Sequence, residues 1–173
     1  MNDMTPTWTV LESPVGLLRV VAAGGAVSAI QFHPFAEAAP ALVGAVRDDA
    51  TPVLVEAVRQ LRAYFAGELR EFELPLAAVG TAYQHRVWDV LGGIGHGSTA
   101  TYAEVARRLG QPLGASRAVG VACGRNPIPI VVPCHRIVGT DGTLTGYAGG
   151  LERKRLLLEL EQAPAVCAQA PLF

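Results

Sequence analysis

The chain has 173 residues, of which 50% are hydrophobic and 17% are charged, and its formal net charge at pH 7 is −1. This composition excludes an intrinsically disordered chain, and the length suits one compact domain or two small ones rather than a large multidomain assembly. No apolar run reaches the roughly 18 residues of a membrane-spanning helix, and the N-terminus lacks the basic and apolar regions of a secretory signal. We therefore expect a cytoplasmic protein that does not contact a membrane.

The charged residues are distributed unevenly along the chain. Residues 1–80 carry five Arg or Lys against nine Asp or Glu, whereas residues 81–155 carry nine against four. A chain so close to neutral does not coat nucleic acid by bulk attraction. Residues 81–155 are therefore the only part that we expect to face an anionic partner.

Residues 8–32 predict a three-stranded antiparallel meander, because β-favouring residues alternate there with turn signals such as Gly24 and Gly25. The Ala- and Pro-rich residues 36–50 are expected to be irregular. Apolar residues then follow at helical spacing over 52–65, with Gly67 as the C-terminal cap. This pattern predicts an amphipathic helix that covers the sheet.

The second half is predicted to begin with three short helices. The first covers residues 83–91, the second runs from the capping box at 101–104 (TYAE) to Leu109, and the third covers 116–123. The last two make a candidate helix-turn-helix, although a small helical bundle would show the same spacing. The second of them offers mostly Ala, Val and Gly, with Arg117 as its only long reaching side chain. It suits shape-tolerant contact with a DNA backbone or minor groove rather than operator recognition.

Three prolines between 127 and 133 exclude a helix and predict an extended path. The Asp-Gly pair at 141–142 then predicts a hairpin, which would serve as the wing of a winged helix. Residues 151–160 predict a last amphipathic helix, with the basic run 153–155 on its outer part.

The three cysteines, Cys123, Cys134 and Cys167, are too few for a disulfide framework and include no C-x-x-C pair typical of zinc sites, so we expect free thiols. We interpret Cys123 as a small helix residue and Cys167 as part of a C-terminal tail.

Cys134 precedes His135 and Arg136, and a positive charge beside a thiol favours the reactive thiolate. A buried structural cysteine is the alternative. Because neighbours in an extended segment point to opposite faces, contact between Cys134 and His135 would need a turn or a bridging water.

Residues 133–137 (PCHRI), preceded by 125–130 (RNPIPI) and followed by 146–151 (GYAGGL), closely resemble the signature of the O6-alkylguanine-DNA alkyltransferases, which are single-use DNA-repair proteins. The resemblance runs from about residue 80 to 161 and implies the stand-alone bacterial type. It implies an α+β fold, with an N-terminal domain (1–79) built from a small antiparallel, ribonuclease H-like sheet and a helix. The C-terminal domain (80–173) would be a winged helix-turn-helix that binds DNA and carries the active site.

The resemblance also implies a mechanism. Cys134 matches the acceptor that takes the alkyl group irreversibly from O6-alkylguanine, and by extension from O4-alkylthymine, in a single turnover. His135 matches the residue that deprotonates this thiol through a water, and Glu161 the carboxylate that orients the histidine. Asn126 matches the residue that braces the active-site turn.

Chemistry on a base inside a duplex requires that the nucleotide be flipped out. Arg117 matches the finger that fills the gap in the base stack, and Tyr102 matches the residue that helps to rotate the nucleotide and donates a hydrogen bond to the base. The remaining matched positions are Ile137, Tyr147 and Ala148 in the pocket wall, and the small Ala118 and Gly120 on the helix face that meets the minor groove.

The implied partner is double-stranded DNA containing O6-alkylguanine, bound by a monomer that can cluster on DNA, with no cofactor and no metal. Three alternatives stay open. An alkyltransferase-like lesion-binding protein would replace the acceptor cysteine, and a winged-helix transcription regulator would tolerate Cys134→Ala. A hydrolase built on Cys134, His135 and Glu161 would release its product and turn over.

Overall fold

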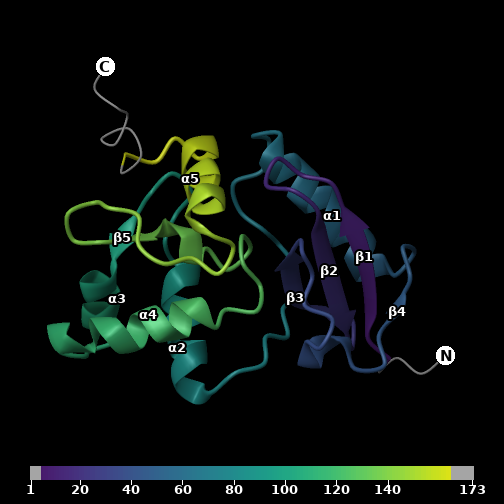
Figure 1. The fold of residues 1–173 in the computed structure, drawn as a ribbon, viewed down its shortest axis with the longest axis horizontal. Helices are drawn as coiled ribbons and strands as arrows, with labels where there is room; N and C mark the ends of the chain where they lie inside the picture. Colours follow the sequence, from purple (N-terminus) through teal and green to yellow (C-terminus); the bar gives the residue numbers. More distant parts are fainter. Residues whose placement is uncertain (1–4, 165–173) are drawn as a thin grey trace. The chain divides into compact units, whose positions relative to one another are not determined.

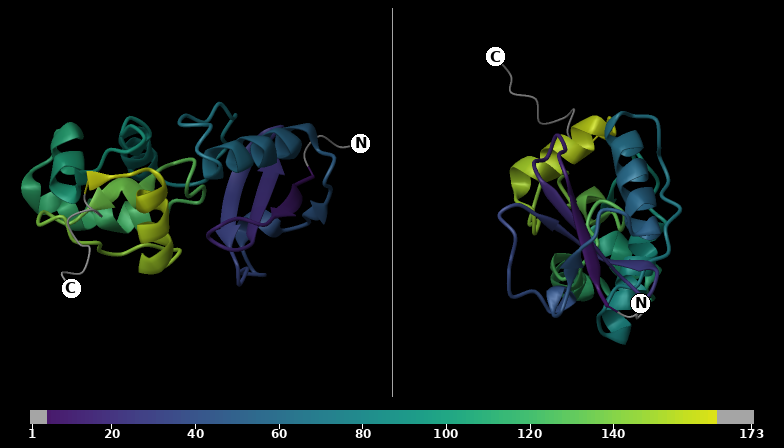
Figure 2. Two further views of the ribbon diagram at one scale, coloured as in Figure 1. Left: turned by 90° about the horizontal axis from the view of Figure 1, so that it is seen from above. Right: turned by 90° about the vertical axis from the view of Figure 1, so that its right-hand side faces the viewer.

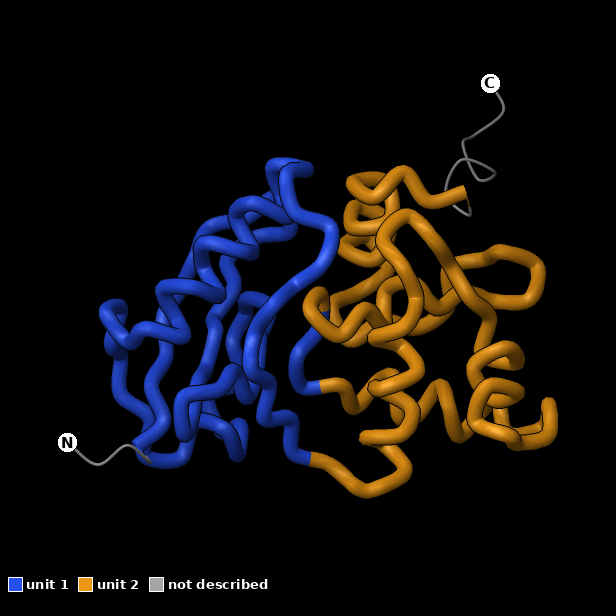
Figure 3. Tube along the Cα trace, turned by 180° about the vertical axis from the view of Figure 1, so that it is seen from behind, with its two compact units in different colours: residues 1–79, 127–129 blue, residues 80–126, 130–173 orange. Residues whose placement is uncertain are grey.

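The computed structural model describes residues 5–164, and the chain divides into two compact units (Figure 3). The first unit contains residues up to Val79 together with Pro127–Pro129, and the second contains Gly80–Asn126 and the residues from Ile130 onward. Cys167, which we assigned to a C-terminal tail, lies outside the described residues. None of the described helices has the length and apolar character needed to cross a membrane.

The first unit is built on a four-stranded sheet with the order β3-β2-β1-β4 (Figure 1). Its strands are β1 (Thr7–Leu11), β2 (Leu18–Ala23), β3 (Ala26–Phe32) and β4 (Val46–Arg47). The predicted antiparallel meander is confirmed, with Thr7 opposite Ala22 and Leu18 opposite Phe32. The expectation of a wholly irregular segment over 36–50 is wrong, because β4 pairs in parallel with β1 and a 3₁₀ turn, η1 (Pro40–Leu42), precedes it.

The turn between β2 and β3 depends on glycine. Gly24 and Gly25 have φ values of +57° and +76°, and a two-residue hairpin turn of this type needs positive φ at both central positions. The outer edge of β3 is not left open, because its Val27 N–H donates to Pro75 O at 2.8 Å and its Ile30 N–H donates to Pro127 O at 2.9 Å. The proline-rich segment Pro127–Pro129 therefore belongs to the first unit although its sequence neighbours belong to the second.

Helix α1 (Pro52–Phe65) runs along one face of this sheet (Figures 1 and 2). Its buried apolar side chains recur every three or four residues, which is the period of a helix with one face on the core: Leu54, Ala57, Leu61 and Tyr64. The predicted cap at Gly67 is confirmed, since the Gly67 N–H donates to Tyr64 O and the Glu68 N–H donates to Ala63 O.

The second unit is mainly helical. Its helices are α2 (Ala82–Gly92), α3 (Tyr102–Arg108), α4 (Ser116–Gly124) and α5 (Leu151–Leu160), with 3₁₀ turns η2 (Leu113–Ala115) and η3 (Cys134–Arg136). Strands β5 (Ala100–Thr101) and β6 (Ile137–Val138) pair in parallel. The mixed α+β class that we expected is therefore confirmed.

The capping box before α3 is present as predicted. The Thr101 hydroxyl accepts from the Glu104 N–H at 3.1 Å, and the Thr101 N–H donates to Glu104 Oε2 at 2.6 Å. Helices α3 and α4 pack against each other as the helix-turn-helix interpretation requires. The Trp88 indole N–H on α2 donates to Ala122 O at 2.9 Å and so connects α2 to α4.

Two expectations for the connecting segments are wrong. Residues 127–133 form bends and turns rather than an extended path, and the buried Ile130 has a φ of +75°, which β-branched residues rarely adopt. Prolines exclude a helix but are compatible with turns as well as with strands. The hairpin at 141–142 is reduced to a turn, in which the Gly139 N–H donates to Thr143 O, because β6 pairs with β5 and no strand forms at 144–145.

Candidate active site

Cys134 opens the one-turn 3₁₀ helix η3 directly after Pro133 and is 6% exposed. Its N–H donates to Val132 O at 2.9 Å. The turn replaces the extended geometry that we expected for Cys134 and its neighbours. Cys134, His135 and Arg136 are all buried in the second unit.

The Asn126 amide fixes both the turn and the thiol. Its Nδ2 group donates to Val132 O at 2.8 Å and to Cys134 Sγ at 3.2 Å. Burial raises the pKa of the Cys134 thiol, whereas the Asn126 hydrogen bond and the positive charge of Lys154 act in the opposite direction. A donor aimed at the sulfur stabilises the thiolate more than the thiol.

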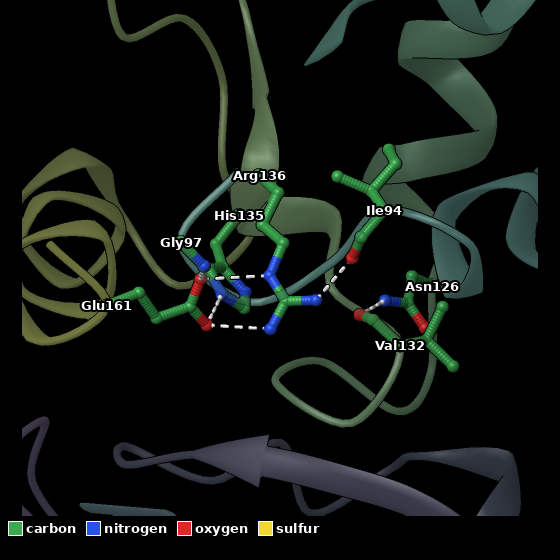
Figure 4. Close-up of polar contacts among 7 residues, drawn as sticks. All are labelled: Ile94, Gly97, Asn126, Val132, His135, Arg136 and Glu161. Atoms are coloured by element: carbon green, nitrogen blue, oxygen red, sulfur yellow. Dashed lines mark hydrogen bonds and ion pairs between the residues drawn. The ribbon is translucent and has the colours of Figure 1, made fainter. Parts of the chain in front are cut away.

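Glu161 lies at the centre of a buried network beside this turn (Figure 4). Its Oε1 is 2.8 Å from His135 Nε2 and accepts from Arg136 Nη2 at 2.9 Å, while its Oε2 accepts from Arg136 Nε at 2.9 Å. The Gly97 N–H adds a longer contact to Oε2 at 3.3 Å. Arg136 is held in turn by the Ile94 carbonyl, to which its Nη1 donates. The carboxylate thus contacts both basic residues that follow Cys134.

The electrostatics of this network assign the proton on His135. Burial alone would raise the pKa of Glu161, but hydrogen bonds from His135 and Arg136 outweigh it and lower that pKa well below its usual range. An ionised carboxylate only accepts, so His135 Nε2 carries the hydrogen. Burial lowers the pKa of His135, so the ring is neutral and its Nδ1 bears a lone pair. This Nδ1 is buried and has no hydrogen-bond partner within residues 5–164, which leaves it able to accept a proton.

A pocket of about 170 Å³ opens onto Cys134. It is lined by Tyr102, Gly120, Cys123, Gly124, Cys134, Gly146, Tyr147 and Ala148. The Tyr102 hydroxyl donates to Thr145 O at 3.1 Å. Burial raises the pKa of Tyr102, so this hydroxyl keeps its proton and stays a donor.

Most of the residues singled out from the sequence lie together in this unit. Tyr102, Gly120, Cys134, Tyr147 and Ala148 line the pocket, and Asn126, His135 and Glu161 belong to the adjoining hydrogen-bond network. Ile137 is buried in β6 and does not line the pocket. Arg117 and Ala118 are exposed in the first turn of α4. Within residues 5–164, no group of three or more His, Cys, Asp or Glu residues could hold a metal ion.

The positions of three residues of this region were not predicted from the sequence. Cys123 lines the pocket and is more than the small helix residue that we inferred. Arg136 is the bidentate partner of Glu161 and not merely a nearby charge. Lys154 is fully buried, so its placement on the outer part of the last helix is wrong. Its position three and four residues before Leu157 and Leu158, which are also buried, is the pattern that indicates the inner face.

Both units match models of one protein family. Residues 7–78 match the ribonuclease-like domain of 6-O-methylguanine DNA methyltransferase, and residues 82–163 match its DNA binding domain. Among curated relatives, the methylated-DNA–protein-cysteine methyltransferase of Mycobacterium leprae is 47% identical over 152 residues, which cover 88% of this chain and 90% of the relative. The Haemophilus influenzae protein of the same name is 42% identical over 160 residues, which cover 92% of this chain and 88% of the relative.

Solved structures agree with these sequence matches. The crystal structure of Mycobacterium tuberculosis OGT in complex with DNA has a TM-score of 0.82 and 44% identity, covering 93% of this chain and 97% of that one. The crystal structure of M. tuberculosis O6-methylguanine methyltransferase also has a TM-score of 0.82, and the match covers 97% of this chain and 96% of that one. The chain therefore belongs to the 6-O-methylguanine DNA methyltransferase family, the methylated-DNA–protein-cysteine methyltransferases.

Proposed function

We propose that Cys134 is the acceptor to which this methyltransferase irreversibly transfers the methyl group of O6-methylguanine in double-stranded DNA. The observation that carries this assignment is the position of its Sγ. The sulfur adjoins a pocket of about 170 Å³, accepts a hydrogen bond from Asn126, and neighbours a buried histidine whose Nδ1 has no hydrogen-bond partner within residues 5–164. A nucleophile, a base and an orienting acid are the parts that covalent catalysis requires.

The reaction begins with the thiol proton, which passes through a bridging water to His135 Nδ1. Glu161 accepts from Nε2 of the same ring and stabilises the imidazolium that forms. The thiolate sulfur then attacks the methyl carbon in line with the C–O6 bond. The new S–C bond forms as the C–O6 bond breaks, and the electron pair of the broken bond moves onto the guanine. The Tyr102 hydroxyl, which donates to Thr145 O in the free protein, turns to donate its single hydrogen to the base.

Cys134 is only 6% exposed, so its sulfur cannot reach the O6 substituent of a base that stays stacked in a duplex, and the nucleotide must be flipped out. Arg117 is exposed at the start of α4, where its long side chain is free to enter the base stack. The small Ala118 and Gly120 on the same helix allow close approach to a minor groove. The M. tuberculosis relative has been crystallised with DNA, which supports a DNA-binding role for this half of the chain.

Once flipped, the base would lie against Tyr147 and Ala148, with the Ile137 backbone as a further contact. The thioether formed on Cys134 has no comparable leaving group, so each chain acts once. This single turnover separates the proposal from a cysteine hydrolase. The intact Cys134 separates it from a protein that only binds lesions.

We further propose a second substrate, an oligomeric state, a cellular location and a division into domains, as the sequence suggested. O4-alkylthymine is a second substrate, and the chain works without cofactor or metal as a cytoplasmic monomer that can cluster on DNA. Residues 80–173 form the DNA-binding and catalytic domain, and residues 1–79 form a separate N-terminal domain.

The test follows the methyl group on the DNA. A duplex with one O6-methylguanine, labelled in its methyl group, is incubated with excess protein, and the loss of this label from the duplex is measured. We expect complete loss with the wild type, none with Cys134→Ala, and complete loss with Cys167→Ala, which removes a thiol outside residues 5–164. Full transfer by Cys134→Ala together with none by Cys123→Ala would make Cys123 the acceptor and contradict the proposal.

A further inference from the structure

Lys154 is a buried cation on α5. Its side chain is 0% exposed, and its Nζ donates to the carbonyl oxygens of Thr145 at 2.7 Å and Gly146 at 3.2 Å. It makes no ion pair with a carboxylate of residues 5–164. A buried ammonium without a counter-charge is costly, so its retention calls for an explanation beyond packing.

The two carbonyls belong to the segment that bounds the pocket. Gly146 lines the pocket together with Tyr147 and Ala148, which follow it directly in the chain. The carbonyl of Thr145 also accepts from the Tyr102 hydroxyl at 3.1 Å, so Lys154 and Tyr102 hold the same atom from α5 and α3.

The charge of Lys154 acts on two thiols and a histidine. Cys134 on η3 and Cys123 on α4 both interact electrostatically with its charge, as does His135 next to Cys134. Burial lowers the pKa of Lys154 to about 8, and the two thiols act in the opposite direction. Burial raises the pKa of Cys123 to about 12, so Cys123 stays protonated at neutral pH. Cys134, which also receives the Asn126 hydrogen bond, is therefore the thiol whose ionisation the cation assists.

We propose that Lys154 is a positioning residue for alkyl transfer, which braces the pocket wall at Thr145 and Gly146 and supplies the buried positive charge that favours the thiolate of Cys134. The inference rests on the proposed role of Cys134 as acceptor. It assigns to one side chain both the shape of the pocket and the charge state of the nucleophile. The effect on the thiolate depends on the positive charge, whereas the bracing of the pocket wall depends on a hydrogen-bond donor to the two carbonyls.

Two substitutions separate these tasks. Lys154→Met removes the charge and the donor, whereas Lys154→Gln removes the charge but keeps an amide donor for the carbonyls. Arg155→Met is the matched control, because Arg155 is the next residue on the same helix and its side chain is exposed. Near-ultraviolet circular dichroism establishes that each variant is folded before its reactivity is compared.

The experiment measures the reactivity of Cys134 without DNA. Iodoacetamide modification of Cys134 is followed by peptide mapping over a range of pH. We expect the rate at neutral pH to fall about tenfold in both Lys154 variants, with the midpoint of the pH profile displaced upward, because the thiolate fraction falls when a nearby cation is removed. The Arg155→Met profile should match that of the wild type.

Methyl transfer from lesion-containing DNA, measured at a pH high enough to ionise Cys134 in every variant, then reports on the pocket. There we expect Lys154→Gln to recover transfer and Lys154→Met to remain slow. An unchanged midpoint in a folded Lys154→Gln protein would overturn the proposal, and this variant decides the question if Lys154→Met does not fold. If the wild type does not take a methyl group from DNA while the midpoint still shifts, the role of Cys134 as acceptor fails but the effect of Lys154 on the thiol stands.

Discussion

Glu161 is the side chain on which the geometry around His135 depends, because it accepts from His135, Arg136 and the Gly97 backbone in a buried setting. Glu161→Gln keeps the shape but leaves the buried Arg136 without its counter-charge and presents an NH₂ group to a donor. We expect the free energy of unfolding to fall by about 3–5 kcal/mol, measured by urea denaturation, with a loss of methyl transfer. Glu159→Gln, an exposed change on the same helix, is the control. Equal stability of the two variants would contradict this view of the network.

The same residues predict how stability depends on pH. The pKa of His135 is lowered from 6.5 by burial, and that of Glu161 is lowered from 4.5 by its hydrogen bonds despite burial. In both cases the unfolded chain binds more protons in acid than the folded chain, so stability falls as pH falls. We expect the melting temperature to decrease from about pH 6.5 downward and to fall further below pH 4.5. Glu161→Gln should flatten the second part of this curve, and a wild-type curve that is level throughout would contradict the prediction.

At the scale of single elements, α4 carries the prediction about DNA. Arg117 is exposed in the first turn of this helix and does not line the pocket. If it acts only on extrusion of the nucleotide, Arg117→Ala should slow repair of duplex DNA by at least about tenfold while leaving transfer from a free O6-alkylguanine base unchanged. Single-turnover rates on the two substrates measure this, and the free base is the internal control. Equal losses on both substrates would refute the role.

The elements that the sequence predicted well are those whose signals are local. The helix over 52–65 and the capping box at 101–104 each follow from residues within a few positions of one another, and both are present. The hairpin predicted at 141–142 does not form, because the segment after the turn contacts distant residues. Thr145 O is held by Tyr102 and Lys154 instead of pairing with β6, and no feature of the turn itself indicates those contacts.

In the site too, features with local sequence signals were predicted and contacts between distant residues were not. The motif around Cys134 singled out Cys134, His135 and Asn126, which are adjacent or nearly so in sequence, and the structure brings them together at one turn. The bidentate contact of Arg136 with Glu161 spans 25 residues and was not predicted. The burial of Lys154 could have been predicted, since it shares a helix face with Leu157 and Leu158. A run of basic residues more often lies on a solvated face of a helix, so the composition of residues 153–155 indicated the wrong side for Lys154.

At the scale of the whole molecule, methylation of Cys134 should reduce stability. Methylation converts the sulfur that accepts from Asn126 at 3.2 Å into a thioether, which cannot ionise and is a weak acceptor. Asn126 also holds the Val132 carbonyl, and it directly precedes Pro127–Pro129, which packs within the first unit. A disturbance at this residue therefore also loosens the turn before Cys134, which its second hydrogen bond holds.

We expect fully methylated protein to melt about 2–4 °C below the unmodified protein for each ~1 kcal/mol lost at this contact. Differential scanning calorimetry of the two forms, prepared from one batch, measures the difference. Mock-treated protein incubated with undamaged duplex is the control. A methylated form that melts at the same temperature or higher would show that the active-site turn accommodates the group without strain.

The assignment of Cys134 as acceptor is tested most directly by intact-protein mass spectrometry after incubation with excess duplex containing one O6-methylguanine. We predict an increase of a single methyl group per chain that does not rise with further substrate and that peptide mapping locates on Cys134. Cys134→Ala should show no increase. No mass change in wild-type protein that binds the lesion tightly, or a methyl group mapped to another residue, would contradict the account.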